Sequence, residues 1–320
     1  MNLRRPSENT LAHVSLVFVT LVWGATFPLV KAALVDISPL RFNLVRMVLA
    51  FLLLAIVNWR SLMGLQARDV AFGAVAGFFL AGGYQLQTLG LNKTSASKAA
   101  FITGLIVVLV PLLQFIPGIR QGGMHRSVWL VLVSSVIAFA GLVLLTTPPG
   151  SGKDILAGIG AGELLCLGCA LAFSFHLLTL ARAAKFMEAR RLGTLQIGFC
   201  ALTMLLTAPL EHHAEMHFTR IVIVALAVTA VLATAAAFTI QSYAQQHLPA
   251  SHTALIFTLE PVFAWLIALL FLGEHLGTRA LVGAAAILAA ILLAELAPGQ
   301  GQQASIVNQA SEVPGIVHGD

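Results

Sequence analysis

The most regular feature of the sequence is a series of long apolar runs separated by short polar segments. Each run is close to the roughly 20 residues that a helix needs to cross a bilayer. The runs lie at about 12–34, 39–58, 70–90, 98–117, 127–147, 159–181, 191–210, 220–242, 252–272 and 278–297. This pattern predicts an all-α membrane protein with ten transmembrane helices, and the short connections leave no room for a soluble domain.

Two stretches of the chain align when the sequence is shifted by 154 residues. Residues 87–108 read QTLGLNKTSASKAAFITGLIVV and residues 241–262 read QSYAQQHLPASHTALIFTLEPV, with seven of 22 positions identical. Each copy would contain five spans. Because five is odd, the two copies cross the membrane in opposite directions, which predicts two inverted five-helix repeats. Inverted repeats are typical of transporters with a substrate site near the bilayer midplane.

The predicted organisation follows from the spans and the repeat. It consists of an N-terminal segment over 1–11, a first five-helix repeat over 12–147, a second over 159–297, and a C-terminal tail over 298–320. The tail is rich in Gly, Gln and Ser without a helical period, and we expect it to be disordered.

The composition supports a membrane environment. Of 320 residues, 58% are hydrophobic and only 10% are charged, whereas soluble domains carry about 25% charged residues. The net charge of +5 comes from Lys and Arg scattered between the apolar runs. Nucleic-acid binding would need a clustered basic face, so the sequence predicts no nucleic-acid partner.

The distribution of basic residues predicts the orientation. With the N-terminus inside, ten Lys and Arg fall in inside segments and six in outside segments, as the positive-inside rule requires. Both termini are therefore expected in the cytoplasm. The first apolar run exceeds the 7–15 residues of a signal-peptide core, so it is expected to remain as the first span.

Several short motifs resemble those of the EamA family of the drug/metabolite transporter superfamily, in its ten-helix form. They are Trp23-Gly24-Ala25-Thr26-Phe27-Pro28, Arg41-Phe42-Asn43, Gly162-Glu163, Glu260-Pro261-Val262-Phe263-Ala264 and Gly273-Glu274. The resemblance covers about 12–297. It implies a permease of the bacterial cytoplasmic (inner) membrane that transports small metabolites, often by exporting amino acids or related compounds.

One acidic residue stands out within a predicted span. Glu260 lies about eight residues, or roughly 12 Å, into the run at 252–272. A carboxylate at that depth is costly and normally faces a cavity or a partner. Glu260 is therefore a candidate for binding a proton or a substrate amine, with a packing role as the alternative. Pro261 beside it can open the helix locally.

Other polar residues inside the spans are candidates for the same site. Arg46 would be a countercharge to a substrate carboxylate or to Glu260, or it would snorkel to the interface. The remaining candidates would line the cavity or couple transport to protons, and their alternative roles are packing and interhelical hydrogen bonding. These residues are Trp23, Thr26, Gln85, Gln87, His176, Gln241 and Tyr243.

The sequence therefore favours a secondary transporter that works by alternating access. It contains no phosphate-binding loop or nucleophile motif, and no cofactor, metal site or catalytic residue is expected. The expected partners are a small-molecule substrate, the lipid bilayer and, as a candidate coupling ion, the proton. The alternative is an integral-membrane enzyme acting on a lipid-type substrate. The substrate, the direction of transport and the oligomeric state stay open.

Overall fold

The computed structural model describes residues 8–114, 116, 128–147, 159–183, 185–211, 216–240 and 256–296. Within these ranges the chain is almost entirely helical, and the one β pairing is an isolated bridge between Ile37 and Met216. The expected all-α class is therefore confirmed. The predicted tail and the candidates Gln241 and Tyr243 lie outside the described residues.

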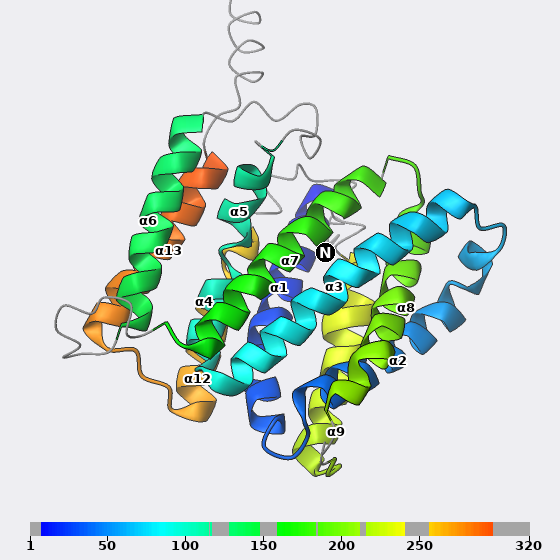
Figure 1. Ribbon diagram of the computed structural model, residues 1–320, viewed down its shortest axis with the longest axis horizontal. Helices are drawn as coiled ribbons and strands as arrows, with labels where there is room; N and C mark the ends of the chain where they lie inside the picture. Colours follow the sequence, from blue (N-terminus) through cyan, green and yellow to red (C-terminus); the bar gives the residue numbers. More distant parts are fainter. Residues whose placement is uncertain are drawn as a thin grey trace, which may run out of the picture.

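The helices follow one another with short connections (Figure 1). They are α1 (Glu8–Ala33), α2 (Pro39–Val57), the 3₁₀ turn η1 (Trp59–Leu62), α3 (Ala67–Lys93), α4 (Ala96–Thr103), α5 (Ile106–Leu113), α6 (Val128–Thr146), α7 (Ala161–Ala183), α8 (Ala189–Thr207), η2 (Ala208–Leu210), α9 (Arg220–Ala227), the π-helical segment η3 (Val228–Ala236), α12 (Glu260–Leu272) and α13 (Thr278–Leu296).

Six of the described helices are long and apolar enough to cross a membrane. They span His13–Ala33, Pro39–Val57, Ala67–Lys93, Ala161–Ala183, Ala189–Leu210 and Arg220–Ile240. Four further apolar helices are shorter, at Ala96–Val110, Leu132–Thr146, Glu260–Leu272 and Thr278–Leu293. The chain is thus a multi-helix membrane protein, with six of the predicted spans present as full-length helices.

Two of the expected spans, 98–117 and 252–272, are interrupted by a short turn within the described residues. The first breaks between α4 and α5 at Gly104 and Leu105, and the second breaks at Thr258 and Leu259, just before α12. The second helix resumes at Glu260, which lies 154 residues after Ile106, where the first resumes. This is the same shift that aligns the two stretches of sequence.

The helices pack in pairs around two main apolar clusters. Figure 1 shows α3 running alongside α7 and packing against α8 on the near side, while α6 and α13 run together at one edge. At one end of the bundle, Arg191 on α8 forms an ion pair with Asp69 on α3, with 2.8 Å between Nη1 and Oδ2. Contacts of this kind join segments that are far apart in sequence.

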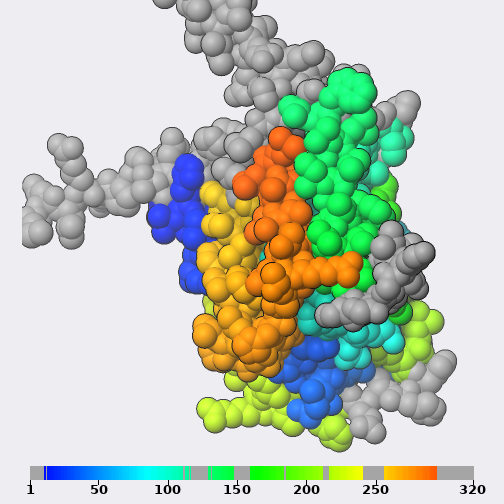
Figure 2. Space-filling view, turned by 90° about the vertical axis from the view of Figure 1, so that its left-hand side faces the viewer, coloured from blue at the N-terminus to red at the C-terminus, as the bar shows by residue number. Residues whose placement is uncertain are grey.

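A second view shows one side of the bundle. In Figure 2, α13 (orange) lies against α6 (green), and α12 (gold) lies against α1 (blue). Many large apolar side chains on the outer faces of these helices are exposed, including Leu270 and Phe271 on α12 and Val136 on α6. An apolar exterior of this kind suits a lipid environment, because lipid rather than water solvates it.

Candidate functional site

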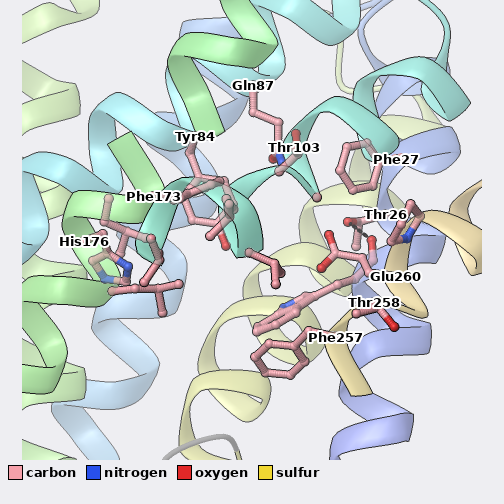
Figure 3. Close-up of a pocket in the computed structure, with 18 of the residues that line it drawn as sticks. Thr26, Phe27, Tyr84, Gln87, Thr103, Phe173, His176, Phe257, Thr258 and Glu260 are labelled. Carbon is pink, nitrogen blue, oxygen red and sulfur yellow. Dashed lines mark hydrogen bonds between the residues drawn. The ribbon is translucent and has the colours of Figure 1, made fainter. Parts of the chain in front are cut away.

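A cavity of about 210 Å³ lies inside the bundle. Its wall is contributed by α1, α2, α3, α4, α5, α7, α12, α13 and the helical residues that follow η3, together with the two helix breaks, and it is mostly apolar with a few charged and polar groups (Figure 3). The lining residues are Trp23, Thr26, Phe27, Arg46, Leu80, Tyr84, Gln87, Thr103, Gly104, Ile106, Val107, Val110, Phe173, His176, Leu177, Phe238, Phe257, Thr258, Glu260, Pro261 and Ile291. A concave apolar site with a few polar groups is the usual form of a small-molecule site.

Glu260 is the acidic residue of this cavity wall. It is the first residue of α12, and Pro261 follows within the first turn, a position that suits proline because the first helical N–H groups have no internal acceptor. Figure 3 shows the Glu260 side chain among Thr26, Thr258 and Phe257. Within the part of the chain that is described, no hydrogen bond or ion pair holds its carboxylate. Its carboxylate is one of the polar groups of the cavity wall.

Gly24 brings α1 against the first turns of α12. A Cβ atom at this position would lie 2.7 Å from Phe263 Cβ and 2.9 Å from both Ala264 N and Glu260 O. Only glycine allows the two helices to approach so closely. The glycine of the Trp23–Pro28 motif therefore sets the position of the turn that carries Glu260.

Trp23 joins α1 to the π-helical segment η3. Its Nε1 donates to Ala233 O at 2.8 Å, and its ring lies 5.2 Å from Phe257 and 6.0 Å from Phe238 between centroids. π-Helix is rare in proteins and is often found at functional sites. The indole is thus held by a hydrogen bond at one edge while its body forms part of the cavity wall.

Arg46 provides the positive charge and is buried, not snorkelling to an interface. Only 4% of its surface is exposed. Its Nε donates to Thr234 Oγ1 on η3 at 3.0 Å, and its Cζ lies 4.3 Å from the centroid of the Tyr84 ring. This stacked, hydrogen-bonded geometry requires the planar guanidinium of arginine. Arg46 therefore connects α2, α3 and η3 at the cavity.

Removing the Thr234 hydroxyl is expected to destabilise the protein. Thr234→Val keeps the side-chain shape but leaves the buried Arg46 Nε without its acceptor, at a cost of about 1–3 kcal/mol. Thr229→Val on the same segment is a matched control, because Thr229 is equally buried and, among the described residues, its hydroxyl bonds only to the α9 backbone. Thermal unfolding in detergent would measure both variants, and equal losses would contradict the role given to Arg46.

The two glutamines of α3 point in different directions. Gln87 lies three residues after Tyr84, so both face the cavity, as Figure 3 shows. Gln85 is rotated by about 100° from Tyr84, and its Nε2 donates to Thr207 Oγ1 of α8 at 2.7 Å. The structure therefore places Gln85 outside the cavity as a link between helices.

His176 lines the cavity from α7 and is 3% exposed. One ring nitrogen, Nε2, lies 2.6 Å from Gln196 Oε1 on α8. Its ring also meets Phe173 and Phe238 edge-on. These contacts hold the imidazole at the end of the cavity away from Glu260 in Figure 3.

Six of the nine residues that the sequence indicated therefore line one cavity: Trp23, Thr26, Arg46, Gln87, His176 and Glu260. Sequence reasoning missed the aromatic wall formed by Tyr84, Phe173, Phe238 and Phe257, as well as Thr103 and Thr258. The helical period at Tyr84 and Gln87 was the one signal that could have indicated part of this wall. The phenylalanines carried no such signal, because lipid-facing and cavity-facing positions are both apolar.

The fold and cavity define a multi-helix membrane protein with an internal, mostly apolar cavity. The family model of the EamA-like transporter family matches residues 10–147 and 160–296, which is nearly all of the described chain. The chain belongs to this family, as the motifs had indicated.

Similar proteins agree with this assignment. An uncharacterized transporter of Archaeoglobus fulgidus is 33% identical over 287 residues, covering 89% of this chain and 86% of that protein. The uncharacterized transporter YvbV of Bacillus subtilis is 25% identical over 300 residues, covering 89% and 91%. A protein of known crystal structure shares the fold, with a TM-score of 0.60, 16% identity and coverage of 95% and 99%.

Proposed function

We propose that this protein is a secondary transporter of small organic metabolites such as amino acids, with export as the expected direction. The observation that carries the proposal is the cavity, whose wall is built from both family-matched segments and holds Arg46 and Glu260. A dipolar solute carries a carboxylate and an ammonium group that these two charges would recognise. The aromatic wall would take its apolar part.

Alternating access around this cavity is the mechanism that we propose. Transporters built from inverted repeats use interrupted helices at the midplane, where the exposed ends of the half-helices face the substrate. The helix breaks at Gly104 and Thr258 both line the cavity, and their 154-residue spacing matches the sequence repeat. These observations support a ten-helix protein of two inverted repeats, 12–147 and 159–297, which would rock around the site.

We propose that both termini lie in the cytoplasm and that the membrane is a bacterial inner membrane; the basic-residue pattern supports the orientation. Protons are the proposed coupling ion, because Glu260 is a carboxylate inside the cavity without a described partner. No specific feature of the described cavity favours the alternative, an integral-membrane enzyme. We therefore retain the transporter as the proposed function.

Ligand-induced stabilisation tests the substrate class. The purified protein would be heated in detergent with a panel of amino acids, amines, nucleosides and sugars. A ligand present at 100 times its Kd is expected to stabilise the folded state by about 2.7 kcal/mol. Amino acids should raise the unfolding temperature of the parent protein, and uptake by loaded vesicles would then measure transport. Stabilisation by nucleosides or sugars alone would contradict the proposed substrate class.

A further inference from the structure

A carboxylate outside the cavity joins the two family-matched segments of the chain. Glu274, just after α12, accepts three hydrogen bonds from the first turn of α4. Its Oε1 lies 2.9 Å from Ala96 N, and its Oε2 lies 3.0 Å from Ser97 N and 2.8 Å from Ser97 Oγ. Carboxylate bonds to helix N-terminal N–H groups are among the stronger hydrogen bonds in proteins.

The Gly273-Glu274 pair explains how this carboxylate reaches α4. Gly273 ends α12 in the left-handed conformation, with φ at 64°, which glycine adopts without strain. The chain turns there, and Glu274 N donates back to Ala268 O at 3.2 Å. The turn directs the carboxylate away from its own helix.

Two more charged residues hold the same corner between α3 and α4. Lys31, near the end of α1, donates to Leu91 O at 2.7 Å and to Thr94 O at 2.8 Å. Glu163, in the first turn of α7, accepts from Thr94 Oγ1 at 2.5 Å. Three charged side chains, Lys31, Glu163 and Glu274, therefore form hydrogen bonds at the corner between α3 and α4. Of the three, Glu274 bonds directly to α4.

Both helices joined by Glu274 reach the cavity at their other ends. α4 ends at Thr103 and is followed by Gly104, and α12 begins at Glu260, all of which line the cavity. The two helices pack together, and small buried residues lie on both, among them Ala100 on α4 and Ala264 on α12. A shift of one helix against the other would therefore change the cavity wall and the Glu274 hydrogen bonds together.

We propose that the hydrogen bonds from α4 to Glu274 keep the cavity closed on the side of the membrane where Glu274 lies, which we call the Glu274 face. The release of Glu274 from α4 is the opening step on this face, and we refer to Glu274 in this role as the latch. The proposal rests on the transporter function proposed above. It assigns the Gly273-Glu274 motif a gating role that is separate from substrate binding, because Glu274 lies outside the cavity lining.

Access to the cavity from each face would test the latch. Val107→Cys places a reporter thiol in the cavity wall, and the chain with Val107 intact is the blank for the native cysteines. A membrane-impermeant maleimide is added to sealed vesicles with the Glu274 face outward and to vesicles of the opposite orientation. Glu274→Gln is expected to increase labelling from the Glu274 face about tenfold, the effect of losing one strong hydrogen bond, with no increase from the other face.

A matched control separates the latch from general loosening. Glu211 also joins distant segments on this face, since its Oε2 accepts from Ser38 Oγ and its Oε1 accepts from Leu40 N at 3.3 Å. Neither of these hydrogen bonds reaches α4 or α12, so Glu211→Gln should leave labelling unchanged. Equal increases in the two variants, or no increase in Glu274→Gln, would overturn the latch.

A milder variant keeps the test decisive if Glu274→Gln does not fold. Ser97→Ala removes only the hydroxyl donor and should increase labelling from the same face about two- to threefold, as expected for one weaker bond. Unchanged labelling in Ser97→Ala, together with unchanged hydrogen exchange across α4, would overturn the proposal. Because the assay needs no substrate, failure of the latch and failure of the transporter function are told apart by the ligand panel.

Discussion

Replacing Glu260 by glutamine is expected to abolish gradient-driven transport while leaving substrate exchange intact. Glutamine keeps the size of the side chain, but it cannot bind and release a proton. The carboxylate lies on the cavity wall and is held by no described partner. Whether it carries a proton can therefore depend on whether the cavity holds a ligand. A positioned proton-transfer group contributes on the order of a hundredfold or more in rate, and a loss of this size is expected.

The measurement compares two fluxes in vesicles, using a substrate found by ligand stabilisation. One flux is driven by an imposed proton gradient, and the other is exchange at equal pH on both sides. Glu188→Gln serves as the control, because Glu188 precedes α8, is exposed, and lies away from the cavity. Gradient-driven flux at the parent rate in Glu260→Gln would remove Glu260 from the coupling mechanism.

Replacing Gly24 by alanine is expected to damage both stability and ligand binding. The added methyl group would overlap Phe263 Cβ and two backbone atoms of α12, none of which can rotate away. Overpacking of this kind costs roughly 1–3 kcal/mol. The helix that carries Glu260 must move to relieve the overlap, so ligand-induced stabilisation should be lost as well.

Gly82→Ala is the matched control for this substitution. Gly82 also lies within a long membrane helix, but a Cβ there would meet only Ala172 Cβ, at 3.8 Å, which is an ordinary contact. Alanine at an unstrained helical position is neutral or gives a gain of up to about 1 kcal/mol. Thermal unfolding of both variants in detergent, with and without ligand, checks the prediction. A Gly24→Ala protein as stable as Gly82→Ala would show that α1 and α12 do not need this close contact.

The motif residues behave differently from one another in the structure. Trp23 and Thr26 line the cavity, while Gly24 between them spaces two helices. Asn43, next to the charged positions of α2, bonds to Tyr84 O and Thr88 Oγ1 and so fixes α2 against α3. Glu163 and Glu274 hold the corner between α3 and α4 rather than a ligand. A short motif in this chain therefore mixes residues that line the cavity with residues that place helices.

The sequence by itself determined the membrane class, because so few charges cannot cover a water-soluble surface and each apolar run approaches the length of a span. It also indicated Glu260 and Arg46, since charged groups inside apolar runs are costly and need a partner or a cavity. The family followed from motifs spread over nearly the whole chain. These inferences depend on composition and local sequence pattern, both of which can be read from a single sequence without a structure.

Only the tertiary structure decided which polar groups meet. The helical period separates Gln87 from Gln85, but it does not say which face of α3 meets the cavity and which meets Thr207. Pro261 alone predicts a local opening of its own helix. It does not predict the turn before Glu260 or the corresponding turn after Thr103 that the structure shows. In a membrane helix the lipid-facing and interior faces are both apolar, so the hydrophobic pattern that orients helices in water is absent, and packing between helices sets the site.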